Sequence, residues 1–69
     1  MPLALAKIGE TVTIRRVTGT DEVRQHLAEL GFIAGEQVTV ISQNGGNLII
    51  QVKDSRIALD KTMANKIFI

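Results

Sequence analysis

Residues 27–40 read LAELGFIAGEQVTV, and this run decides the fold. Its first four residues end a short helix, because Leu27 and Leu30 continue an apolar stripe that begins at Val23. Gly31 follows directly, at the position where a left-handed residue closes a helix. An isolated helix of this length is marginal in water. The stripe therefore predicts that the helix packs against a sheet.

The second half of the run is a tight turn that leads into a strand. Gly35 ends the turn, and residues 36–42 alternate, with Val38 on the apolar face. A similar stretch occurs upstream, because residues 9–14 (GETVTI) match residues 35–40 (GEQVTV). A repeat protein needs at least three stacked units. We interpret the two copies as one turn that is used twice.

The remaining elements follow from β-branched runs and turn residues. Thr20 is a candidate N-cap for the helix, and Asp60 is a candidate cap for one helical turn through Asn65. Residues 43–47 (QNGGN) predict a hairpin loop, and residues 54–55 a two-residue turn. Strands are expected at residues 11–17, 36–42, 48–53, 56–59 and 66–69.

Length and composition favour one mainly β domain over residues 1–69. The chain has 45% hydrophobic residues, no Cys and two aromatic residues, Phe32 and Phe68, so the core must be aliphatic. We expect a small, partly closed, five-stranded barrel. It has one short α-helix after the first strand and a helical turn before the last strand.

The charge balance excludes several partners. Eight Lys and Arg against seven Asp and Glu give a net charge of +1, which is too small to attract nucleic acid or an anionic membrane. Arg15 and Arg16 are expected to point to opposite faces of one strand and form no patch. The apolar runs are too short to span a bilayer, and the N-terminus lacks the order of a secretory signal. We expect a cytoplasmic protein without a membrane-inserted segment.

Catalysis is not expected, and one cluster is a candidate metal site. The only His has no nucleophile at hand, and no Gly-rich phosphate loop is present, so we predict that the protein is not an enzyme. Glu22, His26 and Glu29 lie within a stripe of ~60° on the helix. They could hold a transition metal weakly, such as Fe(II), Zn or Mn. The alternative is a solvated helix flank, and no cofactor is required.

The central run also identifies a family. Leu27, Leu30, Gly31, Gly35 and Val38 give the pattern Leu-x-x-Leu-Gly-φ-x-x-Gly-x-x-Val. This pattern closely resembles the ferrous iron transport protein A (FeoA) family. The resemblance extends to residues 5–9 and 56–69 and so covers nearly the whole chain. These five residues define the scaffold and do not indicate where a partner binds.

The resemblance implies an SH3-like barrel and a cytoplasmic accessory role in bacterial ferrous iron uptake. In that role the family is thought to bind the cytoplasmic GTP-binding domain of the FeoB transporter. Similar domains occur at the C-terminus of iron-dependent repressors of the diphtheria toxin repressor type. Two alternatives therefore stay open: a metal-responsive module around His26, and a stand-alone regulatory domain. Exposed edge strands also allow a homodimer. Many family members have a longer loop at residues 43–47, so any contact made there must differ here.

Overall fold

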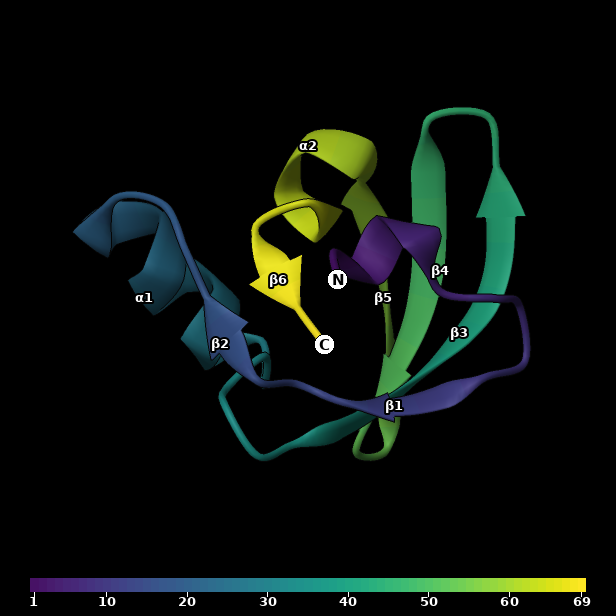
Figure 1. Ribbon diagram of the computed structural model, residues 1–69, viewed down its shortest axis with the longest axis horizontal. Helices are drawn as coiled ribbons and strands as arrows, with labels where there is room; N and C mark the ends of the chain where they lie inside the picture. Colours follow the sequence, from purple (N-terminus) through teal and green to yellow (C-terminus); the bar gives the residue numbers. More distant parts are fainter.

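The computed structural model describes all 69 residues as a four-stranded antiparallel sheet and a two-stranded ribbon around one apolar core (Figure 1). The core is aliphatic except for Phe32, so the expectation of a wholly aliphatic core is wrong at this residue. The sheet has the order β1-β3-β4-β5, and the ribbon joins β2 to β6. The elements are a 3-10 turn at Leu3–Leu5, β1 (Thr11–Thr13), β2 (Arg16–Val17), α1 (Asp21–Glu29), β3 (Gln37–Asn44), β4 (Asn47–Val52), β5 (Ser55–Asp60), α2 (Lys61–Ala64) and β6 (Ile67–Phe68). The expected mainly β architecture with two short helices is confirmed.

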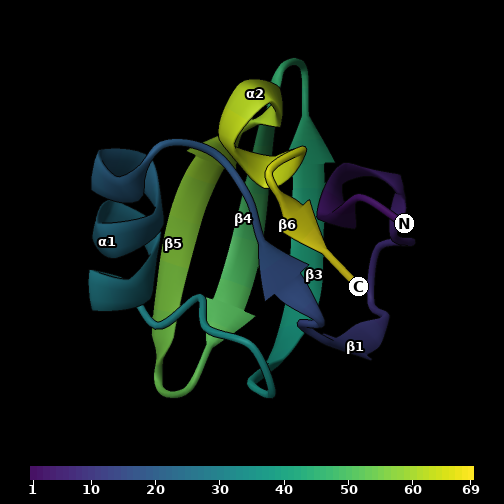
Figure 2. The same cartoon turned by 60° about the vertical axis from the view of Figure 1, so that its left-hand side comes forward.

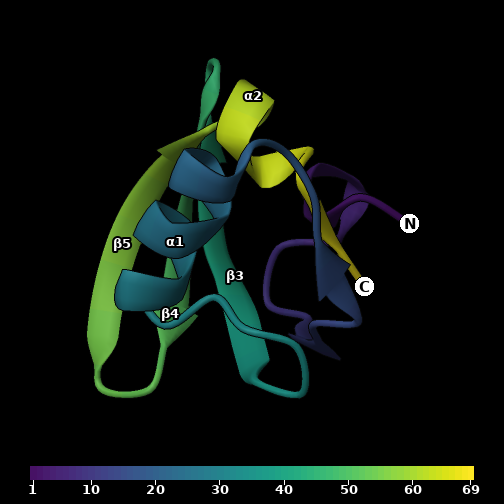
Figure 3. The same ribbon diagram turned by 90° about the vertical axis from the view of Figure 1, so that its left-hand side faces the viewer.

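The predicted helix is confirmed as α1. Thr20 caps it, because its side-chain oxygen accepts a hydrogen bond from the Val23 N–H at 3.2 Å. Leu27 is fully buried, while Val23 and Leu30 are partly buried against the core. Figure 3 shows α1 lying across one face of the sheet, in front of β4 and β5.

The end of α1 is a Schellman motif. Gly31 has φ +105°, and its N–H donates to the carbonyl oxygen of Ala28 at 3.0 Å. The Phe32 N–H donates to the carbonyl oxygen of Leu27 at 2.9 Å. These two bonds reverse the chain and bring the Phe32 ring into the core, where it is 1% exposed.

The repeated turn is also present in the structure. Gly9 has φ +88° and Gly35 has φ +92°. In each copy the following glutamate N–H donates to the carbonyl three residues earlier, at 3.0 Å for Glu10 and 3.1 Å for Glu36. The two copies therefore form the same turn, as the sequence match indicated.

The strands after the two turns pair with each other. β1 and β3 are antiparallel neighbours. At one end the Val40 N–H donates to the Glu10 carbonyl at 3.1 Å, and at the other the Ile14 N–H donates to the Glu36 carbonyl at 2.9 Å. The sequence match thus corresponds to a local two-fold arrangement inside one chain.

The prediction of one strand over residues 11–17 is wrong, and the structure has six strands. β1 ends at Thr13. The Ile14 carbonyl makes the last contact with the β3 side, accepting from the Gly35 N–H at 2.8 Å, and the chain then leaves the sheet. The Arg15 N–H donates to the Phe68 carbonyl at 2.7 Å. The second part of the predicted strand therefore pairs with β6.

Two hairpin turns are placed differently from the prediction. β3 and β4 pair up to Asn44 and Asn47, so the loop at residues 43–47 shrinks to two glycines. The next turn is Lys53–Asp54 and not residues 54–55, since Ser55 already pairs with Val52. β3 also contains an unpredicted bulge between Val40 and Ser42, which bends the strand.

The inward faces of the later elements are confirmed. Leu48, Ile50 and Val52 of β4 are each 2% exposed or less. The Asp60 carboxylate accepts from the Met63 N–H at 2.8 Å and caps α2. None of the helices has the length and apolar character that a bilayer crossing requires.

We expect Gly31→Ala to lower the free energy of unfolding by about 1–3 kcal/mol, because the positive φ strains an L-residue. The added Cβ would also lie 3.1 Å from Cγ2 of Val52. Urea unfolding measures the loss. Gly46→Ala is the control, because Gly46 lacks a positive φ and has no atom within 4 Å of a Cβ. Equal effects of the two variants would contradict this account.

Candidate functional site

The surface has one hollow, which lies where β2 meets β6. It has a volume of about 260 Å³ and is lined by Met1, Arg15, Arg16, Phe68 and Ile69. Arg16 pairs with Phe68 across the ribbon, and the Ile69 N–H donates to the Met1 carbonyl at 2.8 Å. The first and last residues therefore lie side by side at this site (Figure 1).

Both arginines line this hollow, which corrects the prediction that they form no patch. The alternation of a regular strand does not apply to them, because the chain breaks away from the sheet between β1 and β2. The Arg16 guanidinium lies 4.8 Å from the centroid of the Phe68 ring, within the range of a cation–π contact. Arg15 is fixed only through its backbone and has an exposed side chain.

The hollow suits an anionic side chain better than a cofactor. It is smaller than the ~300–1,000 Å³ of ordinary small-molecule pockets. The one salt bridge of the protein joins Arg24 to Asp21 on α1, so neither Arg15 nor Arg16 takes part in a salt bridge. Guanidinium groups bind carboxylates and phosphates through paired N–H donors. The site can therefore bind a carboxylate or phosphate presented by a partner.

Sequence reasoning missed this site because two distant segments build it. Phe68 reaches the arginines only after the ribbon forms, and nothing near Arg15 and Arg16 in the sequence indicates that pairing. The one available signal was the pair of consecutive charged residues that interrupts the alternation after Ile14.

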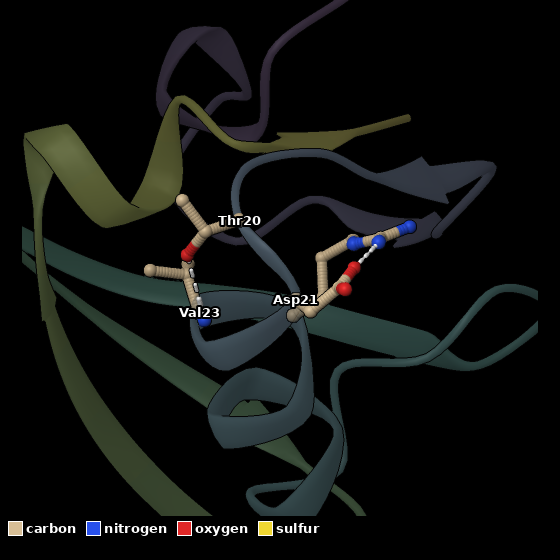
Figure 4. A network of polar contacts seen from close by, with 4 residues as sticks. Thr20, Asp21 and Val23 are labelled. Atoms are coloured by element: carbon tan, nitrogen blue, oxygen red, sulfur yellow. Dashed lines mark hydrogen bonds and ion pairs between the residues drawn. The ribbon is translucent and has the colours of Figure 1, made fainter.

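The start of α1 carries a separate polar network, shown in Figure 4. The Thr20 side chain accepts from the Val23 N–H, and the Asp21 carboxylate accepts from the Arg24 guanidinium. Asp21 and Glu22 stand in the first turn, where carboxylates complement the positive end of the helix dipole. This network fixes where α1 begins.

Glu22, His26 and Glu29 lie exposed along α1. Their side chains do not converge into a group of three metal ligands. Glu22, His26 and Glu29 do lie on one helix, as the sequence indicated, and the metal site stays a prediction.

The five residues of the family motif have the structural roles expected of a scaffold, and none of them lines the hollow. They are Leu27 and Val38 in the core, Leu30 partly buried, and Gly31 and Gly35 at positive φ.

The small antiparallel sheet and ribbon with two short helices place this protein in the class of prokaryotic SH3-like domains. The FeoA protein of Stenotrophomonas maltophilia, solved with zinc and described as a prokaryotic SH3 domain protein, superposes with a TM-score of 0.86. The two are 28% identical, and the match covers 99% of this chain and 87% of that one. A crystal structure of an iron uptake regulatory protein (FeoA) gives a TM-score of 0.90 at 25% identity, over 97% and 91% of the two chains.

The chain belongs to the FeoA domain family, whose family model matches residues 1–69. A protein of Methanocaldococcus jannaschii named "Putative Fe(2+) transport protein A" is 35% identical over 68 residues, which are 99% of this chain and 83% of that protein. The family consists of small accessory domains associated with ferrous iron transport. A manganese-dependent transcriptional repressor superposes with a TM-score of 0.88 at 17% identity, and this chain covers 39% of it. That likeness shows a shared fold alone.

We expect Thr20→Ala to destabilise the protein by about 1 kcal/mol, because the Val23 N–H loses its acceptor. Thermal unfolding followed by circular dichroism measures the loss. Thr20→Ser keeps a hydroxyl in the same place and serves as the control. A Ser variant as unstable as the Ala variant would show that the cap is not the cause.

Proposed function

We propose that this protein is a cytoplasmic accessory protein of ferrous iron uptake. It binds the cytoplasmic GTP-binding domain of a FeoB-type transporter and does not catalyse a reaction. The observation that carries this proposal is the FeoA match over all of residues 1–69. The relative from M. jannaschii, named for Fe(2+) transport, supports the same role.

The hollow between β2 and β6 is the contact that we assign to this partner. Arg15 and Arg16 present two guanidinium groups that form no salt bridge within the protein. Met1 adds apolar surface at the rim, with 55% of the residue exposed. A glutamate or aspartate of the transporter fits the volume of the site. Contact through a few charged side chains is typical of weak, transient complexes with a small interface.

Arg15→Glu combined with Arg16→Glu should weaken binding to the isolated GTP-binding domain by roughly tenfold or more, since both charge contacts become repulsive. Isothermal titration in the GTP-analogue, GDP and nucleotide-free states measures the affinity. Lys7→Glu is the control, because Lys7 is exposed and lies outside the hollow. Thermal unfolding checks that loss of the Arg16–Phe68 contact leaves the fold intact.

The two parts of the proposal fail separately. A wild-type protein that binds the transporter domain in no nucleotide state contradicts the partner. Binding that survives both charge reversals contradicts the hollow as the contact and leaves the partner in place.

A second candidate function is a metal-responsive module around His26. The specific observation in its favour is that the S. maltophilia FeoA, 28% identical to this chain, was solved with zinc. One imidazole and two carboxylates, from Glu22 and Glu29, are suitable ligands for Zn or Fe(II). Three exposed ligands on one helix would give weak, reversible binding.

Anaerobic titration with Fe(II), and a separate titration with Zn, tests this module. His26→Ala should weaken binding by about tenfold or more if the imidazole is a ligand. Gln25→Ala is the matched control on the same helix. Equal affinities of the wild type and the His26→Ala variant would remove the site.

A further inference from the structure

β5 is an unpaired edge of the main sheet. It is last in the order β1-β3-β4-β5, and Figure 3 shows it at the border of the sheet, with α1 in front of the sheet and no further strand beside β5. Residues 55–60 make no backbone hydrogen bond to a turn or loop of the protein. Such an edge is a template on which another strand can pair.

The register of the β4–β5 hairpin shows which groups face outward. Val52 and Ser55 flank a two-residue turn, so they form a hydrogen-bonded pair. The bonded pairs then recur at every second residue. The outward groups therefore are the N–H and carbonyl of Arg56 and Ala58 and the N–H of Asp60, since the Asp60 carbonyl accepts the first hydrogen bond of α2. The side chains of these three residues all stand on the exposed face of the sheet.

This edge is complementary to itself. In an antiparallel pair of two β5 strands centred on Ala58, each Arg56 stands opposite an Asp60 of the other copy. Ile57 then stands opposite the Leu59 of the other copy, on the core side. The charges match twice, because a two-fold axis through the centre repeats every contact. The small Ala58 side chains leave the two strands free to approach.

We propose that β5 pairs with β5 of a second copy of this chain and joins two four-stranded sheets into one. The two Ala58 residues exchange backbone hydrogen bonds, and each Asp60 N–H donates to the Arg56 carbonyl of the other copy. Two Arg56–Asp60 pairs flank this centre. The interface is small, so the dimer dissociates readily.

The opposite edge of the sheet is a poorer candidate. β1 has three residues, a hydrogen-bonded turn precedes it, and after Ile14 the chain leaves the sheet to pair with β6. Thr11 and Thr13 offer no charge there, whereas β5 carries one cation and one anion in the required positions. Charged residues on an edge strand can also prevent pairing with another strand. The experiment below distinguishes this protective role of Arg56 and Asp60 from a role in dimer formation.

Charge reversal gives the main test. Arg56→Asp makes the edge wholly acidic, and Asp60→Arg makes it wholly basic, so each variant alone should be monomeric. A mixture of the two should dimerise, because the acidic edge of one variant then faces the basic edge of the other at both charged positions. Sedimentation equilibrium up to millimolar concentration measures all three samples beside the wild type. We expect the dissociation constant of each single variant to rise by roughly tenfold or more.

Two further variants keep the test independent of folding. Asp60→Arg also removes the α2 cap, so Asp60→Asn provides a cap-competent variant without the charge. Ala58→Pro removes an outward N–H that β4 does not use, and it should abolish the dimer while thermal unfolding shows a folded monomer. Lys7→Glu changes charge away from the edge and should leave the dimer unchanged.

A wild-type protein that stays monomeric at millimolar concentration overturns the proposal and assigns Arg56 and Asp60 a guarding role. A dimer that persists in Ala58→Pro, or a mixture of the two reversed variants that does not associate, also overturns it. None of these results depends on the transporter, so the proposal stands or falls separately from the proposed function.

Discussion

The reversal of the chain at Gly31 is the constraint on which the other contacts depend. A helix that continued past Leu30 would carry Phe32 away from the core and would displace the start of β3. The positive φ of Gly31, and a Val52 side chain 3.1 Å from where a Cβ would lie, leave room only for glycine without strain. Because the Schellman bonds use the Leu27 and Ala28 carbonyls, they satisfy helix-end acceptors that would otherwise lack partners. β3 then begins in the position where it can pair with both β1 and β4.

Structural features that depend only on residues close together in the sequence could be predicted from it. The cap at Thr20, the helix end at Leu30 and the inward face of β4 each depend on a few adjacent residues. The register of the β4–β5 hairpin was not predictable in the same way. Moving the turn from residues 53–54 to 54–55 shifts the partner of each residue by two positions, so Ile57 and Leu59 stay on the same face. The apolar pattern is identical in both registers and cannot choose between them.

The candidate site was less predictable than the fold because it depends on contacts between distant segments. The break between β1 and β2 requires the Gly35 N–H on one side and the Phe68 carbonyl on the other. Residues 11–17 by themselves are an unbroken run of β-branched and charged residues, which predicts one strand with Arg15 and Arg16 on opposite faces. The family motif does not help, because its glycines and leucines are used for the scaffold. Function on this fold therefore has to be argued from the surface that the scaffold leaves exposed.

The two surfaces of the molecule are placed so that both can be used at once. Figures 2 and 3 show β5 on one side of the protein and the β2–β6 ribbon on the other. Pairing through β5 therefore does not cover the hollow formed by Arg15, Arg16 and Phe68. A dimer would carry two such hollows related by the two-fold axis, and weak binding at each would be reinforced where a partner presents two acidic groups at the matching separation. Dissociation of the small β5 interface would return the protein to single-site binding, so the local protein concentration would set the strength of attachment.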